Sequence, residues 1–371
     1  MPARNQSVYV TFDHISSQTG AGLVCLHEIN ALKSVTELQF VICRSSPDLG
    51  VHVKKLNLDR LYMFNPFLYD YFAAETISQD RPSEKIALAH LSCSPANAII
   101  RELDPERFVC NVVAHELKDS VEEHERYYGV GSYPFRHNTD PWLHNILLHQ
   151  ARMADKVICP SSKSADWIRR NVRSDVENIV VIPHGVNMPH SIQPLPNVFK
   201  AGYLGAFGPD KGLVYLVKAW SNLALDDAEM VFAGDCSLAI PSLIGSLPKT
   251  TARFRTLGRV QDACDFYSSV SVYVQPSVTE AFGIPALEAM AAGRPVIVSM
   301  GAGASDCVRD GIDGFVIPPR SPEAIMEKLT YFKDNPDEVR KMGNNAEQRA
   351  SAFTWQEVER MYVDLYQSLL D

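Results

Sequence analysis

The chain has 371 residues, of which 46% are hydrophobic and 21% are charged, and its formal net charge is -9. This length exceeds what one hydrophobic core usually fills, so we expect two domains. The acidic balance argues against a general nucleic-acid-binding protein. The eight cysteines are scattered singly and the N-terminus lacks the apolar stretch of a signal peptide, so we expect a cytoplasmic protein with reduced thiols.

Short β-branched runs alternate with longer amphipathic segments along the chain, which predicts α/β domains with parallel sheets covered by helices. The predicted strands are 8–12, 38–43, 86–91, 108–114, 156–159, 179–182, 200–204, 229–233, 272–274, 295–298 and 314–316. The predicted helices are 22–32, 141–154, 213–225, 336–350, 354–370 and one that ends near 170 and is capped by Ser161 or Ser162.

A segment rich in prolines and turn formers interrupts this alternation between residues 184 and 198. Such composition is typical of a linker between domains. We therefore predict an N-terminal Rossmann-like domain over 1–184, a hinge over 185–198 and a second Rossmann-like domain over 199–350. The last helix, in 351–371, could brace either domain.

The densest pattern lies in residues 276–296, which read as strand, loop, helix, turn and strand. Pro285 favours the first turn of a helix, because its missing N–H would be unpaired there. Residues 281–284 then lie at the helix entrance, where amide donors and the helix dipole attract anions and hydroxyl groups. Glu280 and Glu288 flank this entrance, and carboxylates beside amide donors can bind sugar hydroxyls without a metal.

This block resembles the E-x7-E signature of retaining glycosyltransferases in family 4 of the GT-B superfamily, with Glu280 and Glu288 at the acidic positions. Further similarity lies in 205–212, 233–235, 257–260 and 311–318, and more loosely in 20–22, at His115 and in 182–187. The resemblance implies a GT-B fold, in which two Rossmann-like domains with parallel sheets face each other across a cleft. It also implies that the first domain binds the acceptor and the second binds a nucleotide-sugar donor.

The resemblance assigns a role to each matching residue. Glu280 lies beside the transferring sugar, Lys211 neutralises the leaving diphosphate, and His115 hydrogen-bonds the sugar. Glu288 binds the ribose hydroxyls. The remaining donor-binding residues, which contact the sugar, the phosphates or the base, are Phe282, Gly283, Ile284, Gly20, Gly22, Gly258 and Arg259. No cofactor and no metal are implied, and the sequence has no D-x-D motif for a magnesium diphosphate.

The implied activity is hexosyl transfer with retention, from a UDP- or GDP-sugar to a hydroxyl acceptor. The acceptor is either lipid-linked, with the enzyme peripheral at the inner membrane face, or free.

One position departs from the family pattern, because Ala206 stands where members usually have an arginine that shares the diphosphate charge. Either Arg259 or a residue of the first domain compensates, or turnover is slow, or the protein binds its donor without transfer. A nucleotide-sugar epimerase and a pyridoxal-phosphate-dependent phosphorylase of similar architecture are further alternatives.

Overall fold

The computed structural model describes residues 7–12, 20–36, 38–43, 53–55, 86–92, 105–112, 117–128, 141–172, 178–223, 225, 227–246 and 251–371. The chain forms two compact units, and each is described by itself. Unit 1 comprises Met1–Ala114, Phe135–His184 and Trp355–Asp371, and unit 2 comprises His115–Pro134 and Gly185–Thr354.

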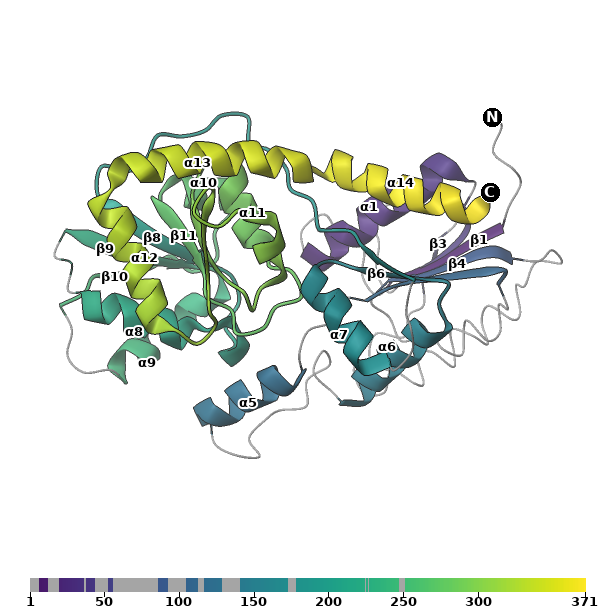
Figure 1. The fold of residues 1–371 in the computed structure, drawn as a ribbon, viewed down its shortest axis with the longest axis horizontal. Helices are drawn as coiled ribbons and strands as arrows, with labels where there is room; N and C mark the ends of the chain where they lie inside the picture. The colour runs from purple at the N-terminus through teal and green to yellow at the C-terminus, as the bar shows by residue number, and fades with distance from the viewer. Residues whose placement is uncertain are drawn as a thin grey trace. The chain divides into compact units, whose positions relative to one another are not determined.

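Unit 1 contains a seven-stranded parallel sheet with the order β3-β2-β1-β4-β5-β6-β7. Strands β1, β3, β4 and β6 of this sheet are labelled in Figure 1. The chain moves outward from β1 to one edge and then returns to pair β4 with the other side of β1. This reversal is the Rossmann topology. The strands are β1 (Ser7–Phe12), β2 (Leu38–Cys43), β3 (Val53–Lys55), β4 (Ile86–Ser92), β5 (Arg107–Asn111), β6 (Lys156–Cys159) and β7 (Ile179–Val181).

Two helices from distant parts of the chain cover one face of this sheet. Helix α1 (Gly20–Val35) and helix α14 (Trp355–Leu370) lie side by side in Figure 1, and their buried side chains share a core with strands β4, β5 and β6. The imidazole of His27 stacks on Trp355 with ring centroids 4.2 Å apart, and its Nδ1 lies 2.5 Å from Oε1 of Glu359. These contacts dock α14 on unit 1.

The other helices that the structure describes in unit 1 are α6 (Pro141–Met153) and α7 (Ser162–Val172), which pack on each other. The hydroxyl of Ser161 accepts the backbone N–H of Ser164 at 3.2 Å, so Ser161 caps α7 as one of the two predicted residues.

Unit 2 contains a six-stranded parallel sheet with the order β10-β9-β8-β11-β12-β13, which again reverses beside its first strand. The strands are β8 (Phe199–Leu204), β9 (Ala228–Ala233), β10 (Phe254–Thr256), β11 (Val272–Gln275), β12 (Val296–Ser299) and β13 (Gly314–Ile317). The helices are α5 (Leu117–Tyr128), α8 (Leu213–Leu223), α9 (Ile240–Gly245), α10 (Ala263–Ser268), α11 (Ile284–Ala291), α12 (Pro322–Asp334) and α13 (Pro336–Ala350). Short 3-10 turns are η1 (Pro209–Lys211), η2 (Asp235–Leu238), η3 (Gly303–Cys307) and η4 (Ser351–Phe353).

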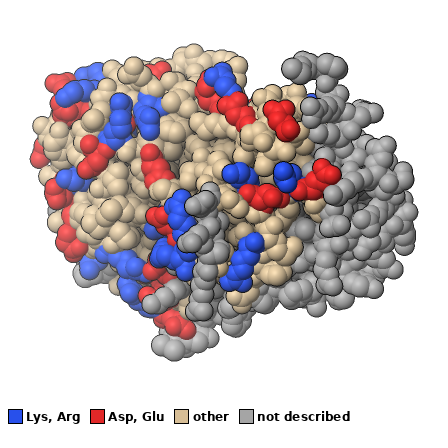
Figure 2. Space-filling view, turned by 45° about the vertical axis from the view of Figure 1, so that its right-hand side comes forward, with Lys and Arg blue, Asp and Glu red and all other residues tan. Residues whose placement is uncertain are grey.

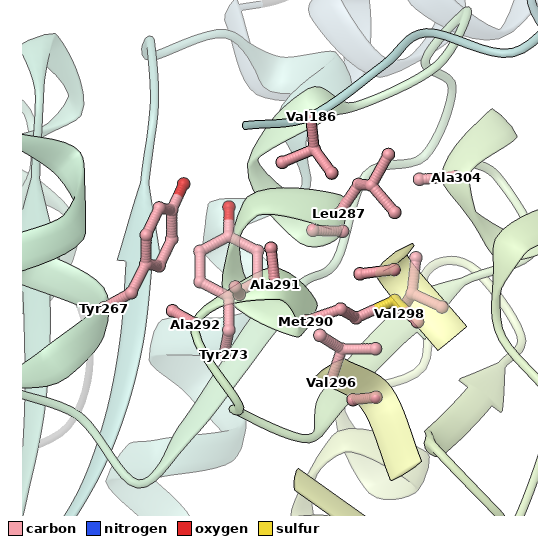
Figure 3. Close-up of a cluster of buried hydrophobic side chains, with 14 of the residues drawn as sticks. Val186, Tyr267, Tyr273, Leu287, Met290, Ala291, Ala292, Val296, Val298 and Ala304 are labelled. Carbon is pink, nitrogen blue, oxygen red and sulfur yellow. The ribbon is translucent and has the colours of Figure 1, made fainter. Parts of the chain in front are cut away.

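Both faces of this sheet are buried, and successive side chains of a strand enter different cores. Val296 and Val298 of β12 pack with Leu287 and Met290 of α11, as Figure 3 shows. Ile297, which lies between the two valines in sequence, belongs instead to the core formed with α8, α9 and α12. The sheet is therefore covered by helices on both sides, as the continuous apolar strands predict.

Most predicted strands and helices are present with bounds that differ by a few residues at most. The prediction of two Rossmann-like α/β domains with parallel sheets is confirmed. The helix α5, which the predicted elements do not include, groups with unit 2 although it lies in the first half of the sequence. The predicted domain boundaries, with a hinge over 185–198, do not include a segment of the first half that groups with unit 2.

Figure 2 shows acidic and basic side chains intermixed over the described part of one face, without a broad basic track. No helix among the described residues is long and apolar enough to cross a membrane.

Candidate functional site

The loops that follow strands β8 and β11 lie at the same edge of the sheet in unit 2. The two strands are parallel neighbours, and the sheet continues from β8 to β9 on one side and from β11 to β12 on the other. Open α/β sheets bind ligands at such a switch point, outside the carboxyl ends of the strands. Lys211 lies in the loop after β8, and Glu280 lies in the loop after β11.

The side chains of Lys211 and Glu280 meet at this edge. Nζ of Lys211 lies 2.5 Å from Oε2 of Glu280 and 3.3 Å from Oδ2 of Asp210. Burial alone would lower the pKa of Lys211, but the two carboxylates outweigh it and hold this pKa above its ordinary value. Lys211 is therefore a permanent cation at the switch point.

The turn that carries Lys211 is held against the loop after β11. Gly212 ends this turn with a φ of 70°, in the left-handed region that favours glycine. A Cβ at Gly212 would lie 2.1 Å from the carbonyl oxygen of Pro276, so any larger residue would push the two loops apart. The backbone N–H of Val278 also donates to the carbonyl of Asp210 at 2.7 Å.

The entrance of α11 lies directly after Glu280. Gly283 is the N-cap residue with a φ of 98°, and the carbonyl of Phe282 accepts the N–H of Ala304 at 2.7 Å. The first amides of a helix have no partner within the helix, and the helix dipole adds positive potential there. The structure therefore places Gly283 and Ile284 where their backbone can meet an anionic or hydroxyl-bearing ligand.

Glu288 lies one turn further along α11. Its Oε2 accepts a hydrogen bond from the hydroxyl of Tyr267 in α10 at 2.7 Å. Burial raises the pKa of Glu288 above its ordinary value, and the hydrogen bond from Tyr267 opposes this rise. Burial, followed by the charge of Glu288, raises the pKa of Tyr267 well above its ordinary value, so Tyr267 remains a donor.

Gly258 and Arg259 follow β10 at the same edge of the sheet. The carbonyl of Gly258 accepts the N–H of Gly234 at 2.7 Å, and its own N–H donates to the hydroxyl of Ser237 at 3.2 Å. Nε of Arg259 lies 2.7 Å from Oδ1 of Asp235, and this hydrogen bond lowers the pKa of Asp235. The guanidinium of Arg259 is exposed and already paired with a carboxylate.

Ala206 lies between β8 and η1 and is exposed. Its carbonyl accepts a hydrogen bond from the hydroxyl of Tyr203 at 3.1 Å. This position presents no charge to a ligand, and Lys211 is the cation that the neighbouring turn supplies.

The remaining predicted residues lie elsewhere in the chain. Gly20 and Gly22 form the first turn of α1 in unit 1. His115 lies outside the described residues, so its predicted sugar contact stays a prediction. The residues that the structure does bring to one edge of unit 2 are Lys211, Glu280, Phe282, Gly283, Ile284, Glu288, Gly258 and Arg259.

Two residues of this edge are absent from the predicted set. Asp210 pairs with Lys211, and its position beside a lysine in a glycine-rich turn was a usable sequence signal. Tyr267 meets Glu288 only because α10 packs on α11, which no local pattern in the sequence indicates.

The arrangement suits a ligand that carries both negative charge and hydroxyl groups. Lys211 and the α11 entrance supply positive potential, and Glu280 and Glu288 supply acceptors for hydroxyls. Within the described ranges, no group of three or more His, Cys, Asp or Glu side chains could hold a metal ion.

Two family models match the chain. The model described as "Glycosyl transferases group 1" matches residues 192–349, and the model described as "Glycosyltransferase Family 4" matches residues 120–188. Together they cover more than half of the chain, and the first contains every predicted site residue that the structure describes in unit 2.

Curated relatives are similar over part of their length. A D-inositol 3-phosphate glycosyltransferase of Streptomyces bingchenggensis is 27% identical in an alignment of 240 residues that covers 57% of this chain and 52% of the relative. An MMP alpha-(1->4)-mannosyltransferase of Mycolicibacterium hassiacum is 27% identical in an alignment of 229 residues that covers 59% of this chain and 56% of the relative. The chain spans about half the length of these curated relatives.

Solved structures match over nearly the whole chain. A sucrose-phosphate synthase from Thermosynechococcus elongatus has a TM-score of 0.77 at 21% identity, covering 98% of this chain and 99% of that one. HepE from Anabaena in complex with UDP-glucose has a TM-score of 0.70 at 16% identity, covering 98% of this chain and 100% of that one. The family and fold predicted from the sequence are thus confirmed, and the chain belongs to the glycosyl transferases group 1 family with a GT-B fold.

Proposed function

We propose that the protein is a retaining glycosyltransferase that moves a hexosyl group from a nucleotide diphosphate sugar to a hydroxyl acceptor. The observation that carries this proposal is the meeting of Lys211 and Glu280 at the switch point, 2.5 Å apart and beside the entrance of α11. A cation, a carboxylate and helix-entrance amides together fit the diphosphate and the sugar of such a donor.

The proposed reaction proceeds on one face of the sugar. The bond between the anomeric carbon and the diphosphate oxygen breaks, and the diphosphate leaves with the bonding electrons. The acceptor oxygen forms the new bond on the same face, and its proton passes to a phosphate oxygen of the leaving group. Lys211 stabilises the charge that develops on that oxygen, an effect worth about 3 kcal/mol for one well-placed donor.

The donor contacts extend from Lys211 along α11. Glu288 accepts hydrogen bonds from the ribose hydroxyls, while the hydroxyl of Tyr267 holds the carboxylate of Glu288 in place. Glu280 and the amides of Phe282, Gly283 and Ile284 bind the transferring sugar. Gly20 and Gly22 contribute backbone to the phosphates and His115 hydrogen-bonds the sugar, as the resemblance implies.

We propose that the donor is a UDP-sugar, because a structural neighbour with the same fold binds UDP-glucose. A guanosine nucleotide is the alternative. We also propose that no metal and no cofactor are required, since Lys211 supplies the charge that a bound divalent cation would otherwise supply. The acceptor is a hydroxyl compound, either free or lipid-linked, and the cytoplasmic location stays a prediction from the sequence.

One observation favours a second candidate, a protein that binds a nucleotide sugar without efficient transfer. Ala206 brings no charge to the loop after β8, and Arg259 is already engaged by Asp235 at 2.7 Å. The donor diphosphate would then be neutralised mainly by one lysine that it must share with two carboxylates. A leaving group with less compensation departs more slowly.

Release of nucleoside diphosphate from UDP- and GDP-sugars tests the proposed transfer. Each donor is incubated with EDTA and a panel of hydroxyl acceptors, and the sugar product is identified by mass spectrometry. Transfer that requires an acceptor and keeps the anomeric configuration supports the proposal. Donor binding without product favours the second candidate, and epimerised donor in the absence of acceptor would identify an epimerase.

A further inference from the structure

Helix α5 lies against η1, the short turn that carries Lys211. It is a markedly polar helix with the sequence LKDSVEEHERYY. It belongs to unit 2, although the segments before His115 and after Pro134 belong to unit 1. A helix with so few apolar residues needs specific partners to hold its place.

A buried carboxylate on α5 connects this helix to the rest of unit 2. The side chain of Glu123 on α5 is 1% exposed, yet it accepts hydrogen bonds from the hydroxyl of Tyr215 and, at 2.8 Å, from Nε of Arg320. Asp119, one turn earlier on α5, lies 3.3 Å from Nη2 of the same Arg320. A carboxylate is buried at such a site only when its partners are in place.

The backbone of Arg320 points to the same role. Among the described residues it is the one non-glycine residue with positive φ, at 59°, a conformation that strains an ordinary side chain. Glycine would fit the turn between β13 and α12 without strain. An arginine held in this conformation indicates that its guanidinium is used, and Glu123 and Asp119 are the groups it contacts.

Tyr215 connects this ion pair to the Lys211 turn. It lies in the first turn of α8, and its backbone N–H donates to the carbonyl of Gly212 at 3.1 Å. Its hydroxyl contacts Glu123 and also accepts a hydrogen bond from Nη1 of Arg126 at 3.1 Å. The same tyrosine thus touches α5 with its side chain and the turn with its backbone.

We propose that Arg320, Glu123 and Tyr215 form a latch that holds α5 on the η1 turn and thereby positions Lys211 for the donor diphosphate. The role of Lys211 rests on the proposed function, whereas the latch itself is a property of unit 2. The three latch residues are positioning residues, because none of them touches the predicted ligand contacts directly.

Two substitutions open the latch in different ways. Glu123→Gln removes the carboxylate charge and keeps the side-chain shape, and Arg320→Gly removes the guanidinium while relieving the backbone strain, so that the chain still folds. Arg320→Lys keeps the positive charge and tests whether a cation at this position is enough to hold α5 in place. Asp337→Asn is the matched control, because Asp337 forms an exposed ion pair with Arg340 at 3.0 Å on α13.

Amide hydrogen exchange of the full-length protein measures the latch without any ligand. The N–H of Lys211 donates to Gly208 at 3.0 Å and that of Gly212 to Pro209 at 3.1 Å, so both report on the turn. We expect Glu123→Gln and Arg320→Gly to speed exchange in α5 and at these two amides, with Arg320→Lys intermediate and Asp337→Asn unchanged. Unchanged exchange in the first two variants would overturn the latch, even if the protein proved to bind no nucleotide.

Transfer kinetics then measure the positioning. We expect Glu123→Gln and Arg320→Gly to lower kcat/KM by about 10- to 100-fold in a protein with Lys211. In a Lys211→Ala background the same two substitutions should cause almost no further loss, because the group they position is gone. Equal losses in both backgrounds, or faster exchange without any loss of kcat/KM, would overturn the positioning role. Failure of the wild-type protein to bind nucleotide or transfer sugar would instead count against the proposed function.

Discussion

Nζ of Lys211 lies 2.5 Å from Oε2 of Glu280, so the cation expected to meet the donor diphosphate is paired with the carboxylate expected beside the sugar. Asp210 adds a second carboxylate at 3.3 Å. Before any ligand binds, the ammonium group of Lys211 is therefore paired with two carboxylates. A diphosphate that binds here must compete with Glu280 and Asp210 for Lys211.

This competition predicts opposite effects for the two partners. Glu280→Gln should tighten UDP binding by about tenfold, because the diphosphate no longer competes with that carboxylate, while transfer falls because a sugar contact is lost. Lys211→Ala should weaken UDP binding and lower transfer by about 100- to 1,000-fold. Calorimetry and product assays measure both, with the exposed Lys218→Ala on α8 as the control. Weaker UDP binding in Glu280→Gln would contradict the proposed competition.

The raised pKa of Glu288 predicts how UDP binding depends on pH. Burial, opposed by the Tyr267 hydrogen bond, holds this pKa above the ordinary value of 4.5. In the proposed site the ribose hydroxyls donate to this carboxylate, so binding would favour the deprotonated form, and UDP affinity should fall as the pH drops toward and through the raised pKa. The fall should therefore begin above pH 4.5.

Glu288→Gln separates this effect from the titration of UDP itself. The variant should bind UDP more weakly at neutral pH, and the part of the pH dependence that comes from Glu288 should vanish. Calorimetric titrations of both proteins from pH 4 to pH 8 give the comparison. Parallel pH profiles for the two proteins would show that Glu288 does not contact the nucleotide.

A cation at position 206 should improve the site. Ala206 is exposed in the loop after β8, and an arginine there could share the diphosphate charge with Lys211. We expect Ala206→Arg to tighten UDP binding by about tenfold and to raise kcat. Asn222→Arg, in the last turn of α8, adds the same charge away from the site as a control. No difference between the two arginine variants would show that position 206 does not face the diphosphate.

Gly212 and Gly311 allow the effect of space to be separated from the effect of backbone strain. Their φ values are 70° and 73°, but a Cβ at Gly212 would lie 2.1 Å from the carbonyl oxygen of Pro276, whereas nothing lies within 4 Å of one at Gly311. Both alanine variants carry strain of about 1 kcal/mol or more. Gly212→Ala should lose a further 1–3 kcal/mol from overpacking and should also lose transfer. Urea denaturation and kinetics of the two variants measure the difference, and equal stability would argue against close contact of the loops.

The regular part of the fold could be predicted because its local patterns agree with its packing. The apolar runs at 38–43 and 156–159 coincide with β2 and β6, each of which has a neighbouring strand on both sides in the sheet of unit 1. The strands Val53–Lys55 and Phe254–Thr256 were not predicted, because each contains a single apolar residue, whereas the equally short β7 is apolar throughout and was predicted. Helix α5 was not predicted either, because it is held by Arg320, a residue about 200 positions away in sequence.

The candidate site could be predicted only in part for a similar reason. The motif around Glu280 and Glu288 identifies the residues, and the strand order brings Lys211 beside Glu280. The ion pair between Lys211 and Glu280 could not be predicted from the sequence. The motif indicates which part of a ligand each residue contacts in a complex, but it does not indicate which side chains contact each other when no ligand is bound. The hydrogen bond from Tyr267 to Glu288 depends on helix packing, which the sequence pattern does not contain.

The proposed donor site in unit 2 is tested most directly by calorimetric titration of UDP, GDP and ADP into the wild-type protein and the Glu288→Ala variant, with EDTA present throughout. We expect that one nucleotide, UDP in our proposal, binds the wild-type protein without metal and that this binding is lost in the variant. Absence of binding by all three nucleotides, or equal binding to both proteins, would contradict it.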